Sequence, residues 1–117
     1  MTATDRLIGF VRADHALPAP VREDALRLLA DTLAVGAAGA TAPGGREALA
    51  AATGWGTGGE ARLLGGSERL PAAGAAFVNA FRIHCLEWDA VHEPAVVHAL
   101  SVVTGALGAA IDRLGGC

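Results

Sequence analysis

The sequence has no lysine and no tyrosine, and its nine basic residues are all arginines that lie singly along the chain. Without lysine, the chain has no amine side chain to form a Schiff base or to act as a lysine general base. Nucleic-acid binding depends on grouped positive charge. Because the arginines form no cluster and the formal net charge is −3, we expect no nucleic-acid partner.

Cysteine and long apolar runs are also scarce. Cys85 and Cys117 do not make a disulfide framework, and the charged N-terminus lacks the apolar stretch of a secretory signal. The longest run without a charged residue, 94–111, has 18 residues and contains His98, Ser101 and Thr104. These polar groups favour a buried helix over a membrane span. We therefore expect a cytoplasmic protein without a membrane partner.

Aromatic residues make up only 4% of the chain, whereas 27 residues are alanine and 16 are glycine. So many small side chains favour closely packed helices over a sheet. We expect one all-α domain over 1–117, a helical bundle of four to five helices. Capping residues, prolines and glycines predict where the elements begin and end. We expect a helix over 5–14 capped by Thr4, helices over 20–39 and 46–53, and an irregular glycine-rich connection over 54–66. A further helix starts at Pro71 and carries Phe77, Phe81, His84 and Trp88 on one stripe, and a last helix over 95–114 is stopped by Gly115 and Gly116.

Reactive side chains are concentrated at the junction of the last two expected helices. Within 15 residues the chain carries His84, Glu87, Asp89, His92, Glu93 and His98. Side chains from both helices can converge there, and free N–H groups at the start of the last helix suit an anion such as a carboxylate. Polar residues are also common at helix junctions simply as caps and solvated loop.

Two kinds of chemistry fit this junction. Histidine paired with a carboxylate suits general acid/base catalysis, because its pKa lies near neutrality. A metal site is the alternative, with ligands drawn from His84, Glu87, His92 and His98. We expect no metal and no cofactor, because His84 falls on the aromatic stripe, where a core histidine is the commoner case. We also expect Cys85 to be a buried structural thiol.

The sequence around the junction resembles the MmgE/PrpD family, which includes 2-methylcitrate dehydratase, cis-aconitate decarboxylase and iminodisuccinate epimerase. The resemblance runs through PAPVREDALRLLADTLAVGAAG, ARLLG, AAFVNAFRIHCLEWDAVHEPAVVH and SVVTGALGAA, which together span nearly the whole chain. It implies that the chain is the first part of a larger helical domain. The family's later lysine and tyrosine pocket residues have no counterpart in this chain.

The family pattern implies roles for individual residues. Glu87 and Asp89 fall on family acids, and His98 falls on an active-site histidine. We expect these three to be catalytic, with His92, Arg82 and His84 binding the substrate. The sequence departs from the pattern at three positions, where the family has aspartate, threonine and proline and this chain has Ala90, Val91 and Ala99.

The resemblance implies a cofactor-independent lyase or isomerase that acts on a small polycarboxylate or related acid. The alternative is a non-catalytic helical subunit that forms a dimer or joins a companion chain. This alternative follows from the three departures, from the partial extent of the resemblance and from the small-residue helix faces. In either case we expect a homo-oligomer or a companion chain.

Overall fold

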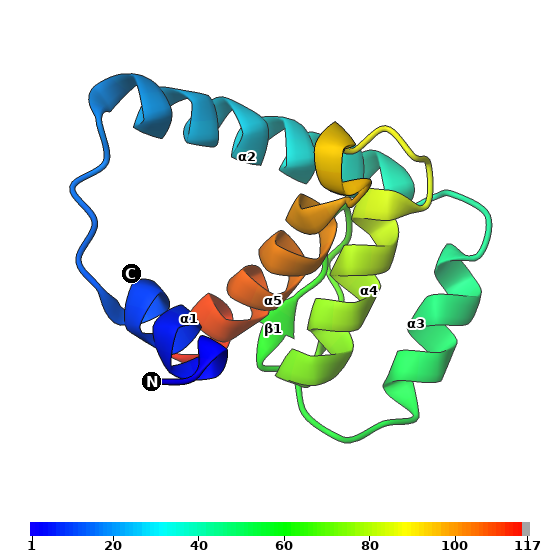
Figure 1. Cartoon of the computed structure of the whole chain (residues 1–117). Helices are drawn as coiled ribbons and strands as arrows, with labels where there is room; N and C mark the ends of the chain where they lie inside the picture. The colour runs from blue at the N-terminus through cyan, green and yellow to red at the C-terminus, as the bar shows by residue number, and fades with distance from the viewer. Residues whose placement is uncertain (116–117) are drawn as a thin grey trace.

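The computed structural model describes residues 1–115. The last two residues, Gly116 and Cys117, lie outside the described part, and with them the sequence predictions made for those positions. Five α-helices, a two-stranded sheet and one short 3-10 helix follow one another along the chain (Figure 1): α1 (Ala3–Arg12), α2 (Ala19–Gly39), α3 (Gly45–Thr53), β1 (Ala61–Arg62), β2 (Arg69–Leu70), α4 (Ala72–His84), η1 (Glu93–Ala95) and α5 (Ala99–Arg113). The predicted all-α class is confirmed.

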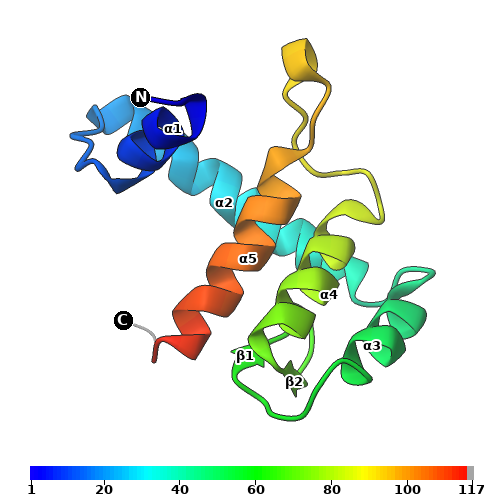
Figure 2. The same cartoon turned by 60° about the horizontal axis from the view of Figure 1, so that its bottom comes forward.

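Helix α4 is the centre of the bundle. It packs along α5 and also contacts α2 and α3, and the small sheet lies beside the start of α4 (Figure 2). The core is built mainly from small side chains: Ala52, Ala61, Leu63, Leu70, Ala75, Val78 and Ala109. Glycine permits the close approach of α5 to α4, because a Cβ on Gly105 of α5 would lie 2.7 Å from the carbonyl oxygen of Ala76 in α4.

The glycine-rich connection ends in a small antiparallel hairpin, in which Ala61 pairs with Leu70 and Arg62 with Arg69. The sequence predicts at most one short strand here. A buried polar side chain on α4 explains why the connection is ordered. Asn79 accepts a hydrogen bond from the Leu64 amide at 2.8 Å and donates one to the Arg62 carbonyl at 2.9 Å. Both groups of the amide are thus paired, as burial requires.

Arg62 also ties β1 to the end of α5. Its amide donates to Asp112 at 2.8 Å, and its guanidinium donates to the same carboxylate at 2.7 Å. These hydrogen bonds favour the charged carboxylate and lower the pKa of Asp112 from 3.8 to about 2.

A pH-dependent contribution to stability follows from this pair. Because the folded-state pKa of Asp112 lies below its ordinary value, its contribution is complete above about pH 4 and is lost as the pH falls towards 2. We expect the difference in unfolding free energy between the wild type and Asp112→Asn to shrink over this range. Urea unfolding at several pH values measures it, and a difference independent of pH would contradict the assignment.

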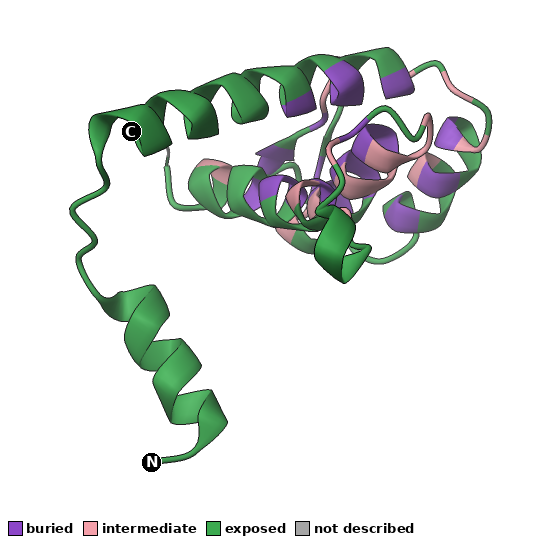
Figure 3. Ribbon diagram, turned by 45° about the horizontal axis from the view of Figure 1, so that its top comes forward, coloured by how far each residue is buried: buried purple, intermediate pink, exposed green. Residues whose placement is uncertain are grey.

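Helices α1 and α2 leave much of their surface uncovered. Every residue of α1 and of the first half of α2 is exposed, while α2 becomes buried only from Thr32 onward (Figure 3). Helix α1 begins two residues earlier than predicted, because Thr2 and Asp5 form a capping box, and Thr4 is therefore not the cap. Among residues 1–115, no helix combines the length and apolar character needed to cross a membrane.

Two predicted helix boundaries at the junction are wrong. Helix α4 ends at His84, so Trp88 lies beyond it with 66% of its surface exposed and does not continue the aromatic stripe. Helix α5 begins at Ala99 rather than Ala95, because Pro94 opens only the short η1 helix. Left-handed conformations at Glu87 (φ 52°) and Val96 (φ 50°) turn the chain at both places. The connection between α4 and α5 is therefore longer than predicted.

Candidate functional site

The end of α4 and the start of α5 hold two histidines close together. His84 is the last residue of α4, and His98 is the residue immediately before α5. Their imidazole rings meet edge to face with centroids 4.6 Å apart. The connection between the helices returns to this point and places Asp89 against both rings.

Asp89 joins the two histidines through one carboxylate. Its Oδ1 lies 3.1 Å from His84 Nδ1, and its Oδ2 lies 3.2 Å from His98 Nδ1. The Asp89 side chain is completely buried, whereas His84 retains 44% and His98 30% of their side-chain exposure. We refer to these three residues as the His84–Asp89–His98 cluster.

The cluster constrains the protons on its imidazoles. A carboxylate oxygen only accepts, so the hydrogen bond between His84 and Asp89 requires a proton on His84 Nδ1. A neutral His84 ring then carries its lone pair on Nε2. The contact to His98 has the distance of an ion pair but not the alignment of a hydrogen bond, and within residues 1–115 its buried Nδ1 has no hydrogen-bond partner.

The other three predicted site residues are not brought into this cluster. Arg82 is buried and donates from Nη1 to the Leu64 carbonyl, so its guanidinium holds the connection after β1. Glu87 is exposed at the left-handed turn. His92 is exposed, and its Nδ1 accepts a hydrogen bond from the Ala95 amide at 3.3 Å.

Cys85 lies next to the cluster in sequence but has different surroundings. Its thiol points to the carbonyl oxygens of Arg82 and Gly39, at 3.5 and 3.8 Å. Burial raises the pKa of this thiol, the opposite of what an activated nucleophile requires. These contacts agree with the structural role expected for Cys85, but the residue is partly exposed rather than buried as predicted.

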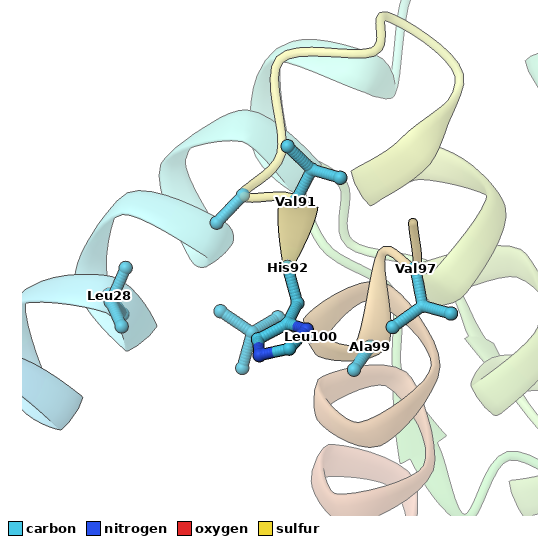
Figure 4. A pocket seen from close by; sticks show the side chains of 7 residues that line it. Leu28, Val91, His92, Val97, Ala99 and Leu100 are labelled. Atoms are coloured by element: carbon cyan, nitrogen blue, oxygen red, sulfur yellow. The ribbon is translucent and has the colours of Figure 1, made fainter. Parts of the chain in front are cut away.

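A pocket of about 240 Å³ opens beside the connection between α4 and α5 (Figure 4). His92 is its only ionisable lining residue, and the wall includes the chain neighbours of Asp89 and His98. The full lining is Leu28, Ala90, Val91, His92, Val97, Ala99 and Leu100. The sequence does not predict Leu28, Val97 or Leu100 as pocket residues. Leu28 comes from α2, and no pattern in the sequence links it to the junction.

Comparison with known families identifies the family of this chain. The family model described as the MmgE/PrpD N-terminal domain matches residues 10–116. The chain belongs to the MmgE/PrpD family. Searches of curated proteins and of solved structures find no match.

The pocket wall includes Ala90, Val91 and Ala99, the three positions that we expect from the sequence to depart from the MmgE/PrpD pattern. All lining residues except His92 are apolar, so the His84–Asp89–His98 cluster adjoins a largely apolar pocket.

Proposed function

We propose that this MmgE/PrpD chain is a lyase or isomerase that performs acid/base chemistry on a small polycarboxylate or related acid. The carrying observation is that buried Asp89 contacts Nδ1 of both His84 and His98. This arrangement supports His98 as the general acid/base and Asp89 as the residue that positions it. Dehydration, decarboxylation and epimerisation of such acids each break or form a bond at a carbon beside a carboxylate.

The proposed proton transfer uses His98 Nε2. With Nδ1 placed 3.2 Å from an Asp89 oxygen, a proton on that nitrogen leaves the Nε2 lone pair free to accept a proton from substrate carbon. The resulting imidazolium is stabilised by the Asp89 charge and returns the proton from Nε2 to the product. The His84 imidazole contacts the other oxygen of the same carboxylate, Asp89 Oδ1.

The start of α5 supports recognition of the substrate carboxylate. Within the described chain, the His98 side chain makes no capping hydrogen bond to this helix, so the first amides of α5 have no side-chain acceptor from their cap. Such amides favour an anion. The apolar pocket wall favours an acid that also carries an aliphatic portion.

Deuterium exchange tests this proposal directly. The protein is incubated in D₂O with a panel of small polycarboxylates and hydroxy acids, and the ¹H NMR signal of the C–H beside each carboxylate is followed. Protein-dependent loss of that signal, or formation of a new product, is expected for at least one acid. A folded protein that exchanges and converts none of them would contradict the proposal.

A second candidate function is a non-catalytic helical subunit that pairs with a second copy of this chain. Its support is an exposed apolar row on α2, where Leu26, Leu29 and Leu33 retain 59%, 37% and 39% of their surface. Arg27 pairs with Glu23 and Asp24 within the same helix, so these charges do not prevent a second copy from packing on the row.

The oligomeric state separates this candidate from a monomer. Sedimentation velocity over a range of concentrations is expected to show a dimer for the wild type and a monomer for Leu26→Glu. Leu7→Glu, a matched change on exposed α1, is the control and should remain dimeric. A wild type that stays monomeric at every concentration would exclude self-pairing.

A further inference from the structure

We infer that the His84–Asp89–His98 cluster is also a binding site for a divalent transition-metal ion such as Zn²⁺. The three residues offer two imidazole nitrogens and one carboxylate oxygen, a ligand set that zinc and its neighbours accept. One potential ligand atom from each residue lies within 4.8 Å of the others. This set differs from the one that the sequence suggests, because Asp89 takes part while Glu87 and His92 do not.

The separations between the ligand atoms suit a small tetrahedral ion. Zinc bonds of about 2.0–2.1 Å place neighbouring tetrahedral ligands about 3.3 Å apart. One carboxylate oxygen of Asp89, Oδ2, lies 3.4 Å from His84 Nδ1 and 3.2 Å from His98 Nδ1. This single oxygen is therefore already spaced from both imidazole nitrogens as zinc requires.

A buried polar atom of the cluster supports this assignment. His98 Nδ1 is buried and, within residues 1–115, has no hydrogen-bond partner, although it lies beside a fully buried carboxylate. A buried polar atom without a partner is unfavourable, and a bound cation would satisfy it. The partial exposure of both imidazoles leaves a route for the ion and an open side for water.

Metal binding at this cluster would affect the proposed reaction, although the metal-site inference does not depend on that reaction. A metal on Nδ1 of both histidines occupies the nitrogen that carries the proton of the His84–Asp89 hydrogen bond and the nitrogen that the proposed reaction needs protonated in His98. The bound ion would therefore compete with the orientation of His98 by Asp89. Metal binding is measured without any substrate, so failure of one proposal leaves the other open to its own test.

Zinc titration of the purified, metal-free chain is the direct experiment. Isothermal calorimetry with Zn²⁺ is expected to give one ion per chain, and His84→Ala and Asp89→Asn are each expected to weaken binding at least about tenfold. His92→Ala is the matched control, since His92 belongs to the same connection but not to the cluster, and it should bind Zn²⁺ like the wild type. Circular dichroism establishes that each variant is folded.

Three outcomes would overturn the assignment. The first is a folded wild type that binds no Zn²⁺ at millimolar concentration. The second is a folded His84→Ala variant that binds as tightly as the wild type, which is informative even if Asp89→Asn does not fold. The third is a loss of affinity in His92→Ala as large as that in His84→Ala.

Discussion

Replacing His98 with alanine is expected to lower deuterium exchange into the substrate by about 10²- to 10⁴-fold, the usual contribution of a general acid/base. The reason is geometric. Only His98 combines a place at the start of α5, a contact of Nδ1 with buried Asp89 and a partly exposed ring. Alanine removes the Nε2 lone pair that takes the proton. The exchange assay in D₂O measures the rate, with substrate in excess so that a change in binding does not obscure it.

A matched histidine provides the control for this experiment. His15 is exposed, and its ring contacts Phe10 at the end of α1, so His15→Ala should exchange substrate at the wild-type rate. Urea unfolding of both variants separates a loss of chemistry from a loss of fold. Undiminished exchange in a folded His98→Ala variant would exclude His98 as the general acid/base and would leave His84 as the histidine to examine next.

Most of the fold could be predicted because helix boundaries are local. Pro20 and Gly39 bound the expected α2, and Thr53 ends α3 as expected. The junction could not be predicted in the same way. Its boundaries depend on left-handed turns at Glu87 and Val96, two residue types for which this conformation is uncommon.

The same turns explain what could be predicted of the site. A helix continued from His84 would carry Asp89 to a different face, because five residues advance the helix by about 140° beyond a full turn. The observed reversal at Glu87 instead brings Asp89 back beneath His84 and His98. The sequence could therefore predict which segment carries the reactive groups, whereas only the path of the chain shows which three of them meet.

The expected catalytic residues and the expected departures from the family pattern lie in different parts of the structure. Two of the three residues expected to be catalytic, Asp89 and His98, are in contact. Ala90, Val91 and Ala99 lie instead on the pocket wall. Loss of polar groups from a wall alters which substrate is bound, because apolar walls favour apolar groups. Under the proposed function, we therefore expect these three positions to affect which substrate is bound rather than the acid/base step.

The crossing of α2 and α4 carries the largest expected effect on stability. A Cβ on Gly39 would overlap the carbonyl oxygen of Arg82 and come within 2.7 Å of its carbonyl carbon, so the two backbones would have to separate. Gly39→Ala is therefore expected to lower the free energy of unfolding by about 3 kcal/mol, at the upper end of the usual range for overpacking. Equilibrium unfolding in urea measures the change.

Gly108 on α5 is the matched control, because it receives the same substitution in open space. A Cβ there meets no atom of residues 1–115 within 4 Å outside its own helix. Gly108→Ala should raise the free energy of unfolding by about 0.5–1 kcal/mol, since alanine is the better helix former. Equal effects at the two positions would mean that helix propensity, rather than the approach of α2 to α4, explains the glycine at position 39. Opposite effects would show that the close approach of α2 to α4 requires a glycine at position 39.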